Sequence, residues 1–237
     1  LPQIQRERHF DYTKAVDGLR QILWGLFMKV VVADNCATVV NHVFKDQESL
    51  NAGSLFVGAV FFAFQIYGDF SGYSNIALGT ARLFGVELLR NFNYPYFSRD
   101  IAEFWRRWHI SLSSWFKDYL YIPLGGSKGG MWMKIRNTFI IFLVSGFWHG
   151  ASWNFIIWGG LHGFYLGFER FLISKFKLNS FFSDVRPFYK NIAIILYTGF
   201  TFLLVTCFWV FFRSPNLSVV MAIFKGVANL QKGVNPS

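Results

Sequence analysis

Apolar residues along this chain fall into long runs that short polar stretches separate. The runs cover residues 19–44, 52–81, 137–168 and 191–212. An α-helix needs about 20 consecutive apolar residues to cross a bilayer, whereas a half-buried strand alternates apolar and polar residues over a few positions. The pattern therefore predicts an all-α fold, a polytopic bundle of transmembrane helices that occupies residues 1–237 as one membrane domain.

Charged residues interrupt the first run, in which Arg20, Lys29 and Asp34 lie. On an α-helix, side chains three or four positions apart are neighbours. Lys29 and Asp34 are five positions apart, so we do not expect them to face each other well. We interpret this segment as a tilted helix or as one that faces the bundle interior.

The second run contains one charged residue, Asp69, within the sequence Gly-Asp-Phe-Ser-Gly-Tyr-Ser at residues 68–74. Glycine, aspartate and serine favour turns and helix caps, which predicts a break there with Asp69 capping the next helix. The alternative is that Asp69 is an intramembrane polar group that lines a substrate path.

Residues 100–120 show a helical period with two unlike faces. One stripe is apolar and mostly aromatic, and consists of Ile101, Phe104, Trp105, Trp108, Leu112, Trp115, Phe116 and Tyr119. The opposite face is polar and largely basic, with Glu103, Arg106, Arg107, Ser113, Ser114 and Lys117. Asp100 and Glu103 have the spacing of a capping box, and Glu103 and Arg107 that of a favourable i,i+4 pair. The pattern predicts an amphipathic helix at the membrane surface, with His109 on the border between its faces.

The third run, residues 137–168, contains no Asp, Glu, Lys or Arg and is too long for one simple crossing. Basic residues outnumber acidic ones on both sides of it, in residues 99–136 and 170–190, and such flanks tend to stay in the cytoplasm. We therefore favour a re-entrant arrangement, in which the chain enters and returns. One long tilted helix is the alternative.

His149 is an ionisable side chain within this uncharged run, which makes it a functional candidate, because burying a group that can carry charge is costly. Gly146 and Gly150 beside it permit the close approach of another backbone or of a ligand. His162 lies thirteen positions further, nearly on the opposite side of an ideal helix. We assign His162 a structural role in glycine-rich helix packing.

Composition agrees with a membrane location. Of 237 residues, 53% are hydrophobic, 21% aromatic and 15% charged, and the net charge is +10. Because the basic residues lie between apolar runs, attraction to an anionic cytoplasmic leaflet accounts for them better than nucleic-acid binding does. We expect a multi-pass protein of the cell (inner) membrane, in contact with membrane lipids, and a piece of a larger protein. Cys36 and Cys207 are expected to pack within apolar segments.

Catalytic motifs of the common kinds are missing from the sequence. There is no HExxH zinc motif and no GxSxG elbow, and the five histidines are scattered. A buried neutral imidazole still suits one chemistry, the removal of a proton from a hydroxyl as it attacks an activated carbonyl. A membrane site would also keep water from hydrolysing the activated acyl group. From the residues alone, a general base and a structural histidine are equally good interpretations of His149.

Five ordered motifs resemble the membrane-bound O-acyltransferase family. They are YGDFSGYS at 67–74, NFNYPY at 91–96, FWRRWHISL at 104–112, DYLYIPLGG at 118–126 and WHGA at 148–151. The branch they are most similar to is the membrane subunit of bacterial alginate O-acetyltransferase, and the run at 123–127 looks like that of the acetyl branch.

The resemblance implies a polytopic helical fold around a funnel that reaches the site from both membrane faces. It implies that His149 is the catalytic histidine and that His109 is a second functional histidine. Candidate substrate-binding residues are Asp69, Trp105, Arg106 and Trp148. It further implies an acyl thioester donor, acetyl-CoA or an acyl carrier, with no bound cofactor or metal. The acyl group would cross the membrane to an extracytoplasmic polysaccharide such as alginate, through a partner acetyltransferase protein outside the membrane.

Two other functions stay open. A sister branch of the family transfers D-alanine to teichoic acid from a carrier protein. A transporter or assembly subunit would instead use the histidine as a proton relay. Such a relay favours several carboxylates within the membrane, for which Asp34 and Asp69 are the candidates.

Overall fold

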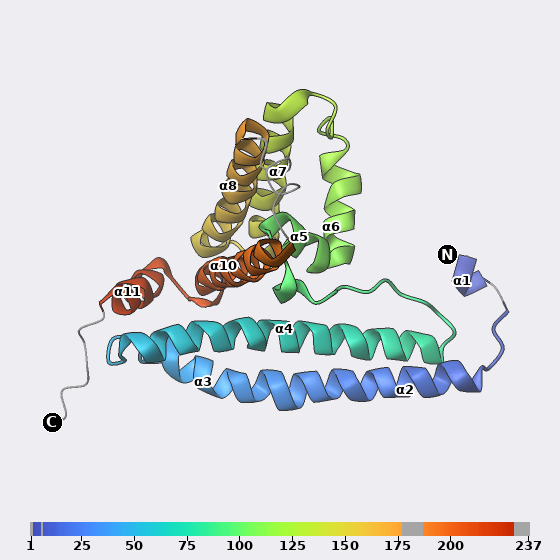
Figure 1. Cartoon of the computed structure of the whole chain (residues 1–237). Helices are drawn as coiled ribbons and strands as arrows, with labels where there is room; N and C mark the ends of the chain where they lie inside the picture. The colour runs from blue at the N-terminus through green and yellow to red at the C-terminus, as the bar shows by residue number, and fades with distance from the viewer. Residues whose placement is uncertain (1, 6, 177–186, 230–237) are drawn as a thin grey trace. The chain divides into compact units, whose positions relative to one another are not determined.

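The computed structural model describes residues 2–5, 7–176 and 187–229, and all regular secondary structure within these ranges is helical (Figure 1). This confirms the all-α fold that the apolar runs predict. In chain order the helices are α1 (Pro2–Gln5), α2 (Tyr12–Leu26), the π-helix η1 (Phe27–Ala33), α3 (Asp34–Lys45), α4 (Ala52–Leu83), the 3-10 helix η2 (Pro95–Phe97), α5 (Ile101–Arg107), α6 (Ile110–Phe116), the π-helix η3 (Lys117–Tyr121), α7 (Gly130–His149), α8 (Trp153–Phe176), α10 (Pro187–Arg213) and α11 (Leu217–Ala228).

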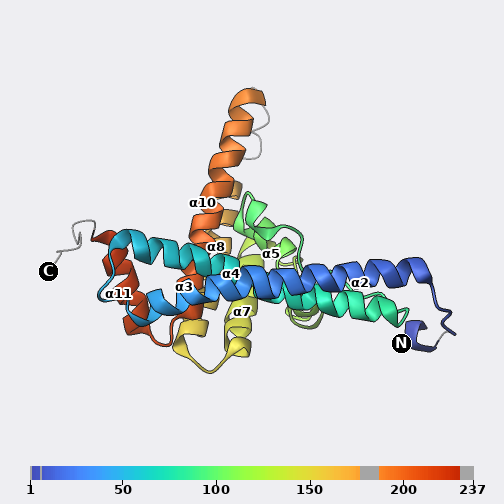
Figure 2. The ribbon, with the colours of Figure 1, turned by 90° about the horizontal axis from the view of Figure 1, so that it is seen from below.

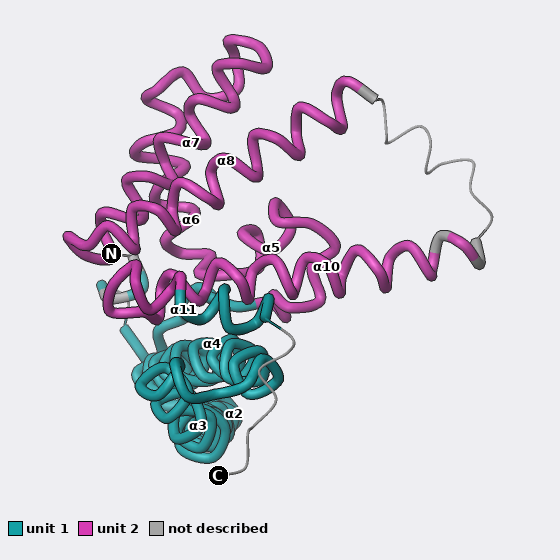
Figure 3. The backbone as a smooth tube through the Cα atoms, turned by 90° about the vertical axis from the view of Figure 1, so that its left-hand side faces the viewer, with its two compact units in different colours: residues 1–92, 222–237 teal, residues 93–221 magenta. Residues whose placement is uncertain are grey.

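The chain forms two compact units, which Figure 3 colours separately. Residues 1–92 and 222–237 make up unit 1, and residues 93–221 make up unit 2. Within the described ranges, three helical segments are long and apolar enough to cross a membrane: Tyr12–Lys45, Ala52–Leu83 and Asn191–Arg213. These segments confirm a multi-pass membrane protein.

Unit 1 is built on two long helical rods that lie side by side (Figure 1). α2, η1 and α3 follow one another without a break and pack along α4 in the opposite direction. A Cβ atom on Gly25 would lie 2.6 Å from the carbonyl oxygen of Gly72, and one on Gly18 would lie 2.8 Å from that of Gly79. Glycine is therefore needed for this close packing of backbones, which is how helices associate where lipid surrounds them.

The expectation that Lys29 and Asp34 do not face each other is wrong, because η1 is a π-helix. Its backbone bonds join residues five positions apart, and the Asp34 N–H donates to the Lys29 carbonyl. The wider turn brings the side chains together, with Lys29 Nζ 2.9 Å from Asp34 Oδ1. Lys29 Nζ also lies 2.7 Å from Asp69 Oδ1 of α4. One lysine thus pairs with two carboxylates within the helices of unit 1.

The turn predicted around Asp69 is also wrong, since α4 is continuous there. Asp69 caps no helix, and α4 is capped instead by Asn51, whose side chain accepts a hydrogen bond from the Ser54 N–H at 2.8 Å. The glycines that suggested a turn serve helix packing. A Cβ atom on Gly68, for example, would lie 3.1 Å from the Met28 carbonyl oxygen.

In unit 2, the amphipathic helix predicted for residues 100–120 is broken in the middle. After α5, Trp108 is extended and His109 adopts the left-handed conformation, with φ 44°, before α6 begins. Phe104, Trp108 and Phe116 of the predicted apolar stripe are buried, whereas Trp115 and Tyr119 of the same stripe are exposed. The periodicity of the sequence is the same with or without this break and could not reveal it.

The start of α5 follows the predicted capping pattern. The Asp100 carboxylate accepts a hydrogen bond from the Glu103 N–H, and Glu103 pairs with Arg107 at 2.6 Å. Glu103 Oε2 also accepts from the backbone N–H and from Nε of Arg99, each at 3.0 Å. The side chain of Glu103 is only 8% exposed. A buried, fully paired carboxylate therefore anchors the first turn of α5.

The third apolar run reverses direction, as the enter-and-return interpretation predicted, and a single long helix is wrong. α7 and α8 are antiparallel neighbours, and the chain turns at residues 150–152, directly after His149 (Figure 2). A Cβ atom on Gly146 or Gly159 would overlap a backbone carbonyl of the facing helix. The two helices thus touch through their backbones next to His149.

The fourth apolar run, residues 191–212, forms most of α10, which ends at Arg213 shortly before Pro215. α10 packs against α8 and η2. It is tied to the start of α5 by Thr201, whose hydroxyl donates to the Arg99 carbonyl at 3.0 Å. This packing brings the aromatic residues near the end of α10 to the α7–α8 pair.

Candidate active site

His149 is the last residue of α7 and lies in a cage of aromatic rings. Its ring centroid is 4.9 Å from that of Trp148, 5.3 Å from that of Trp158 and 5.0 Å from that of Phe212. Phe155 lies 6.2 Å away. The rings come from α7, α8 and α10, so three helices hold the imidazole in place and restrict its access to water.

His109 contributes a second imidazole from the N-cap position of α6. Its φ of 44° is a left-handed conformation, which costs a non-glycine residue on the order of 1 kcal/mol and persists where the surroundings impose it. Its ring lies 6.4 Å from that of Trp148, which also contacts His149. Burial lowers the pKa of His109 from 6.5 to about 4, so its side chain is neutral at neutral pH.

A cavity of about 190 Å³ opens beside His109 and is lined by α5, α6, η3 and α7. The lining residues are Ala102, Trp105, Arg106, His109, Leu112, Ser113, Phe116, Lys117, Tyr121, Ile141, Phe142 and Ser145. The walls are mostly apolar, but Arg106 and Lys117 add positive charge, and two serines add hydroxyls. Such a cavity suits a ligand with an apolar part and an anionic part.

Of the predicted candidates, the structure brings His109, Trp105 and Arg106 together in this cavity, and Trp148 joins His109 to His149. Asp69 belongs to unit 1, where its carboxylate pairs with Lys29, and it is not part of the cavity. The ion pair makes Asp69 a less suitable substrate ligand than the sequence suggested.

His162 is nearer to this centre than an ideal helix predicted. The argument that it lies opposite His149 fails, because the chain turns between them at residues 150–152. Both imidazoles contact Trp158, whose ring lies 5.3 Å from His149 and 5.1 Å from His162. His162 also accepts a hydrogen bond at Nδ1 from Trp105 Nε1, at 3.2 Å.

Sequence reasoning missed several residues of the site. Ser145 lies in the cavity lining, and the spacing of four positions to His149 placed both on one face of a helix. That signal was available in the sequence. Trp158 and Phe212, in contrast, reach His149 only through the packing of α8 and α10 on α7, which no local pattern shows.

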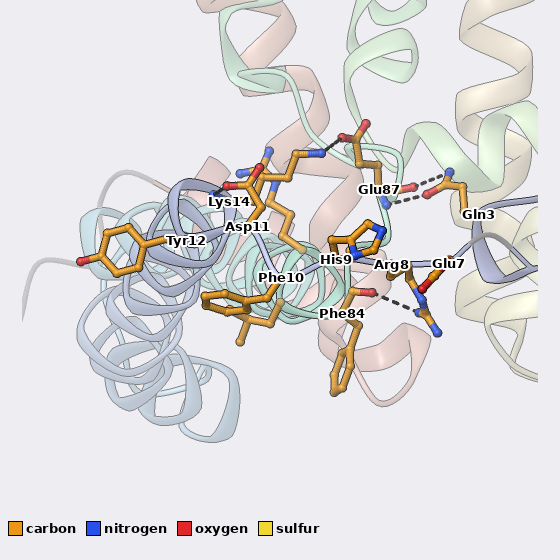
Figure 4. A pocket seen from close by; sticks show the side chains of 13 residues that line it. Gln3, Glu7, Arg8, His9, Phe10, Asp11, Tyr12, Lys14, Phe84 and Glu87 are labelled. Atoms are coloured by element: carbon orange, nitrogen blue, oxygen red, sulfur yellow. Dashed lines mark hydrogen bonds and ion pairs between the residues drawn. The ribbon is translucent and has the colours of Figure 1, made fainter.

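A larger hollow, of about 980 Å³, lies in unit 1 between the start of α2 and the end of α4 (Figure 4). Several of its polar side chains bond to neighbouring groups of the same hollow. Lys14 pairs with Glu87 at 3.5 Å, Gln3 bonds to the backbone of Glu87, and Arg8 donates to the Phe84 carbonyl at 3.1 Å. Because the polar groups of this hollow pair with one another and are exposed to solvent, we take the cavity beside His109 as the candidate site.

Comparisons with known proteins place the chain in a family. A model of the membrane-bound O-acyltransferase family matches residues 4–212. The chain is 41% identical over 211 residues to a probable alginate O-acetylase of Azotobacter vinelandii, which covers 89% of this chain and 40% of the relative. It is 39% identical over 232 residues to a peptidoglycan O-acetyltransferase of Helicobacter pylori, covering 97% and 42%. A teichoic acid D-alanyltransferase of Streptococcus thermophilus is 36% identical over 161 residues, covering 62% and 38%.

The chain thus spans about 40% of the length of these relatives. The family match extends through both units and includes His109, His149 and the helices that surround them. It agrees with the helical fold, with the three membrane-crossing segments and with the motifs seen in the sequence. The chain therefore belongs to the membrane-bound O-acyltransferase family.

Proposed function

We propose that the full protein moves an acyl group, acetyl in the first place, from a cytoplasmic thioester donor across the membrane for the O-acylation of an extracytoplasmic polysaccharide. The observation that carries this proposal is the pairing of the two imidazoles around Trp148, with His149 in an aromatic cage and His109 in the wall of a cavity. Relatives named for alginate and peptidoglycan O-acetylation, at 41% and 39% identity, support acetyl as the group transferred.

His149 acts as the general base. Its neutral imidazole accepts the proton of the acceptor hydroxyl while the hydroxyl oxygen attacks the thioester carbonyl carbon. A C–O bond forms, the tetrahedral intermediate collapses, and the C–S bond breaks. The sulfur leaves as a thiolate and receives the proton that His149 had taken, which restores the neutral imidazole. The apolar cage keeps water, a competing acceptor, away from the activated acyl group.

The donor occupies the cavity beside His109. Apolar walls from α6 and α7 suit the acyl group and the thioester arm, and Arg106 and Lys117 suit the phosphate groups that coenzyme A and carrier-bound donors share. His109 lies where the cavity meets Trp148, so it contacts the donor rather than removing the acceptor proton.

The acceptor is proposed from the relatives alone. Alginate is our first choice and peptidoglycan the second, because the relatives named for these polymers differ by only two points in identity. The partner would be an extracytoplasmic acetyltransferase protein that receives the group and passes it to the polymer. D-alanine transfer to teichoic acid is less well supported, since that relative covers only 62% of this chain.

The test uses the full-length protein in membrane vesicles with its cytoplasmic face outward, supplied with radiolabelled acetyl-CoA. Polysaccharide or partner protein inside the vesicles should acquire alkali-labile, ester-linked label that depends on the protein. Parallel vesicles contain alginate, peptidoglycan fragments or teichoic acid, so the acceptor is identified in the same experiment. Ester-linked label from D-alanine alone, or none from any thioester, would contradict the proposal.

A further inference from the structure

His162 is a polar side chain within a cluster of aromatic rings. It is 0% exposed. Aromatic rings surround it, with centroid distances of 5.0 Å to Trp105, 5.9 Å to Phe142, 5.1 Å to Trp158 and 4.7 Å to Phe208. Burying an imidazole among such rings is unfavourable unless it makes a useful hydrogen bond. The polarity of His162 therefore requires an explanation beyond packing.

The hydrogen bond with Trp105 supplies that explanation. An indole nitrogen can only donate, so the Nδ1 atom of His162, 3.2 Å from Trp105 Nε1, must be the acceptor. The neutral ring then carries its proton on Nε2. Among the described residues, this Nε2 atom has no hydrogen-bond partner. One side of the imidazole is thus left unsatisfied while the other side holds Trp105, which singles out the Trp105 bond as the contact that the histidine provides.

Trp105 is at the same time a wall of the donor cavity. It lines that cavity together with His109 and Phe142. Its ring also packs against Phe142 at 5.0 Å and against Trp158 at 5.7 Å. A hydrogen bond at the indole nitrogen prevents rotation of the ring about its side-chain bonds. His162 is thus hydrogen-bonded to a ring that forms part of the cavity wall.

We infer that His162 is a positioning residue that holds Trp105 as a wall of the acyl pocket and so restricts the enzyme to short acyl groups. This inference rests on the proposed function, because it assumes that the cavity takes the acyl end of a thioester donor. A Trp105 ring released from His162 would leave room for a longer chain. Pockets of this kind discriminate by about 10- to 200-fold for each methylene group, so the effect is measurable.

The test compares two amide substitutions at one position. In His162→Asn, the side-chain oxygen reaches the place of Nδ1 and can still accept from Trp105. In His162→Gln, the longer side chain brings its amide to the place of Nε2 and leaves Trp105 without an acceptor. The readout is the ratio of kcat/KM for acetyl-CoA to that for butyryl-CoA, measured on the full-length protein in membranes, with protein abundance followed by immunoblot.

We expect His162→Gln to lower the acetyl preference by about tenfold and His162→Asn to stay within a few-fold of the unaltered enzyme. If His162 had a merely structural role, the asparagine and glutamine variants would behave alike. That result would overturn the inference. Trp105→Phe, which removes the donor of the same bond, should lower the preference as His162→Gln does. Adding His162→Gln to it should change nothing further.

Three further outcomes can be told apart. If the histidine variants do not accumulate in the membrane, Trp105→Phe decides alone, and an unchanged acetyl preference in that variant rejects the inference. If the unaltered protein transfers no acyl group from any thioester, the proposed function fails. If it transfers acetyl but neither amide nor Trp105→Phe moves the preference, only the role of His162 is wrong.

Discussion

The two imidazoles of the site are held by different means. His149 is fixed by rings from three helices, so its position follows from packing. His109 is fixed by its own backbone, in a left-handed conformation between α5 and α6. A residue held by packing suits a base that must stay aligned with its acceptor, and a residue on a helix junction suits contact with a ligand that enters and leaves.

His149→Gln should abolish most acyl transfer while the protein still accumulates in the membrane. Glutamine keeps a similar size and polarity but cannot take a proton from a hydroxyl. General-base help is worth about 10²–10⁴-fold in rate, or roughly 3–5 kcal/mol of barrier. The measurement is the acetyl content of the polysaccharide, with His9→Gln, a change in an exposed histidine of unit 1, as the control. Acetylation within a few-fold of the control rules out His149 as the base.

Substitution of His109 by glycine and by alanine distinguishes the role of the imidazole ring from that of the backbone conformation. His109→Gly removes the ring and adopts φ 44° freely, whereas His109→Ala removes the ring and keeps the strain of roughly 1–2 kcal/mol that the histidine already bears there. If the ring contacts the donor, both variants should raise the KM for acetyl-CoA by about tenfold or more, the value of one good hydrogen bond to a charged or polar group. Activity retained in His109→Gly but lost in His109→Ala would show that only the backbone turn matters.

At the scale of the helices, glycine is the residue that decides how close two elements come. Gly159 of α8 faces the Phe142 carbonyl of α7, and a Cβ atom there would overlap it. Gly199 of α10 has no atom within 4 Å of its would-be Cβ. Composition alone treats the two glycines as equal, although one is required by packing and the other is not.

Gly159→Ala should separate α7 from α8 and destabilise the protein by about 1–3 kcal/mol, the usual cost of overpacking. Trp158 would move with α8, so acyl transfer should fall as well. Gly199→Ala is the matched control, expected to be neutral or slightly stabilising because alanine favours a helix. The midpoint of thermal unfolding in detergent compares the two. Equal midpoints would contradict the close contact of α7 with α8.

Glu103 should make the stability of unit 2 depend on acid. Burial alone would raise its pKa, but the hydrogen bonds and charges of Arg99 and Arg107 outweigh burial and lower the pKa from 4.5 to about 2. The ionised form therefore stabilises the fold above pH 4.5, and this contribution, about 3 kcal/mol, disappears as the pH falls toward 2.

Glu103→Gln is the corresponding test. The variant should unfold at a lower temperature than the unaltered protein at pH 7, because it cannot form the two ion pairs. The difference should shrink steadily below pH 4.5, where the unaltered carboxylate begins to lose its advantage over the unfolded chain. A difference that stays constant down to pH 3 would show that the network around Glu103 contributes through shape rather than charge.

The sequence predicted helices well and their interruptions poorly. Apolar runs and the capping pattern at Asp100 are local signals, and the structure confirms both. The π-helix that aligns Lys29 with Asp34, and the break at His109, depend on contacts with other helices and leave no mark on periodicity. At Asp69 a local signal was present but predicted the wrong structure. The glycines beside it pack against η1 instead of forming a turn.

The same distinction between local sequence signals and contacts between helices applies to the candidate site. His149 and His109 could be predicted as candidates from an ionisable group in an uncharged run and from motif resemblance. Their shared contact with Trp148 could not, because it requires the turn after α7 and the kink before α6 together. The bond between Trp105 and His162 joins residues 57 positions apart and was equally out of reach of any local pattern.

At the scale of the whole molecule, the net charge of +10 and the α7–α8 pair together indicate an orientation in the membrane. A Cβ atom on Gly167 would meet Ile135 at 2.9 Å, so the end of α8 lies beside the beginning of α7. The basic residues before α7 and at the end of α8 therefore share one end of the pair, and the positive-inside rule places that end in the cytoplasm.

The turn after His149 lies at the other end of the pair. His149 lies thirteen positions after Arg136, a rise of about 20 Å along a helix, against a hydrocarbon core of about 30 Å. The imidazole would then lie beyond the middle of the membrane as seen from the cytoplasm. This position suits a base that meets an acceptor from outside and a donor from inside.

Three single cysteines test this orientation in full-length protein whose Cys36 and Cys207 are replaced by serine. Ser127→Cys precedes α7, Ser174→Cys lies near the end of α8, and Ala151→Cys lies in the turn, and all three positions are exposed. A membrane-impermeant thiol reagent should modify the first two in vesicles with the cytoplasmic face outward and leave the turn unmodified. Modification of Ser127→Cys and Ser174→Cys from opposite faces would contradict the shared end. Modification of both from the outer face alone would reverse the orientation, and with it the side from which the donor reaches Arg106 and Lys117.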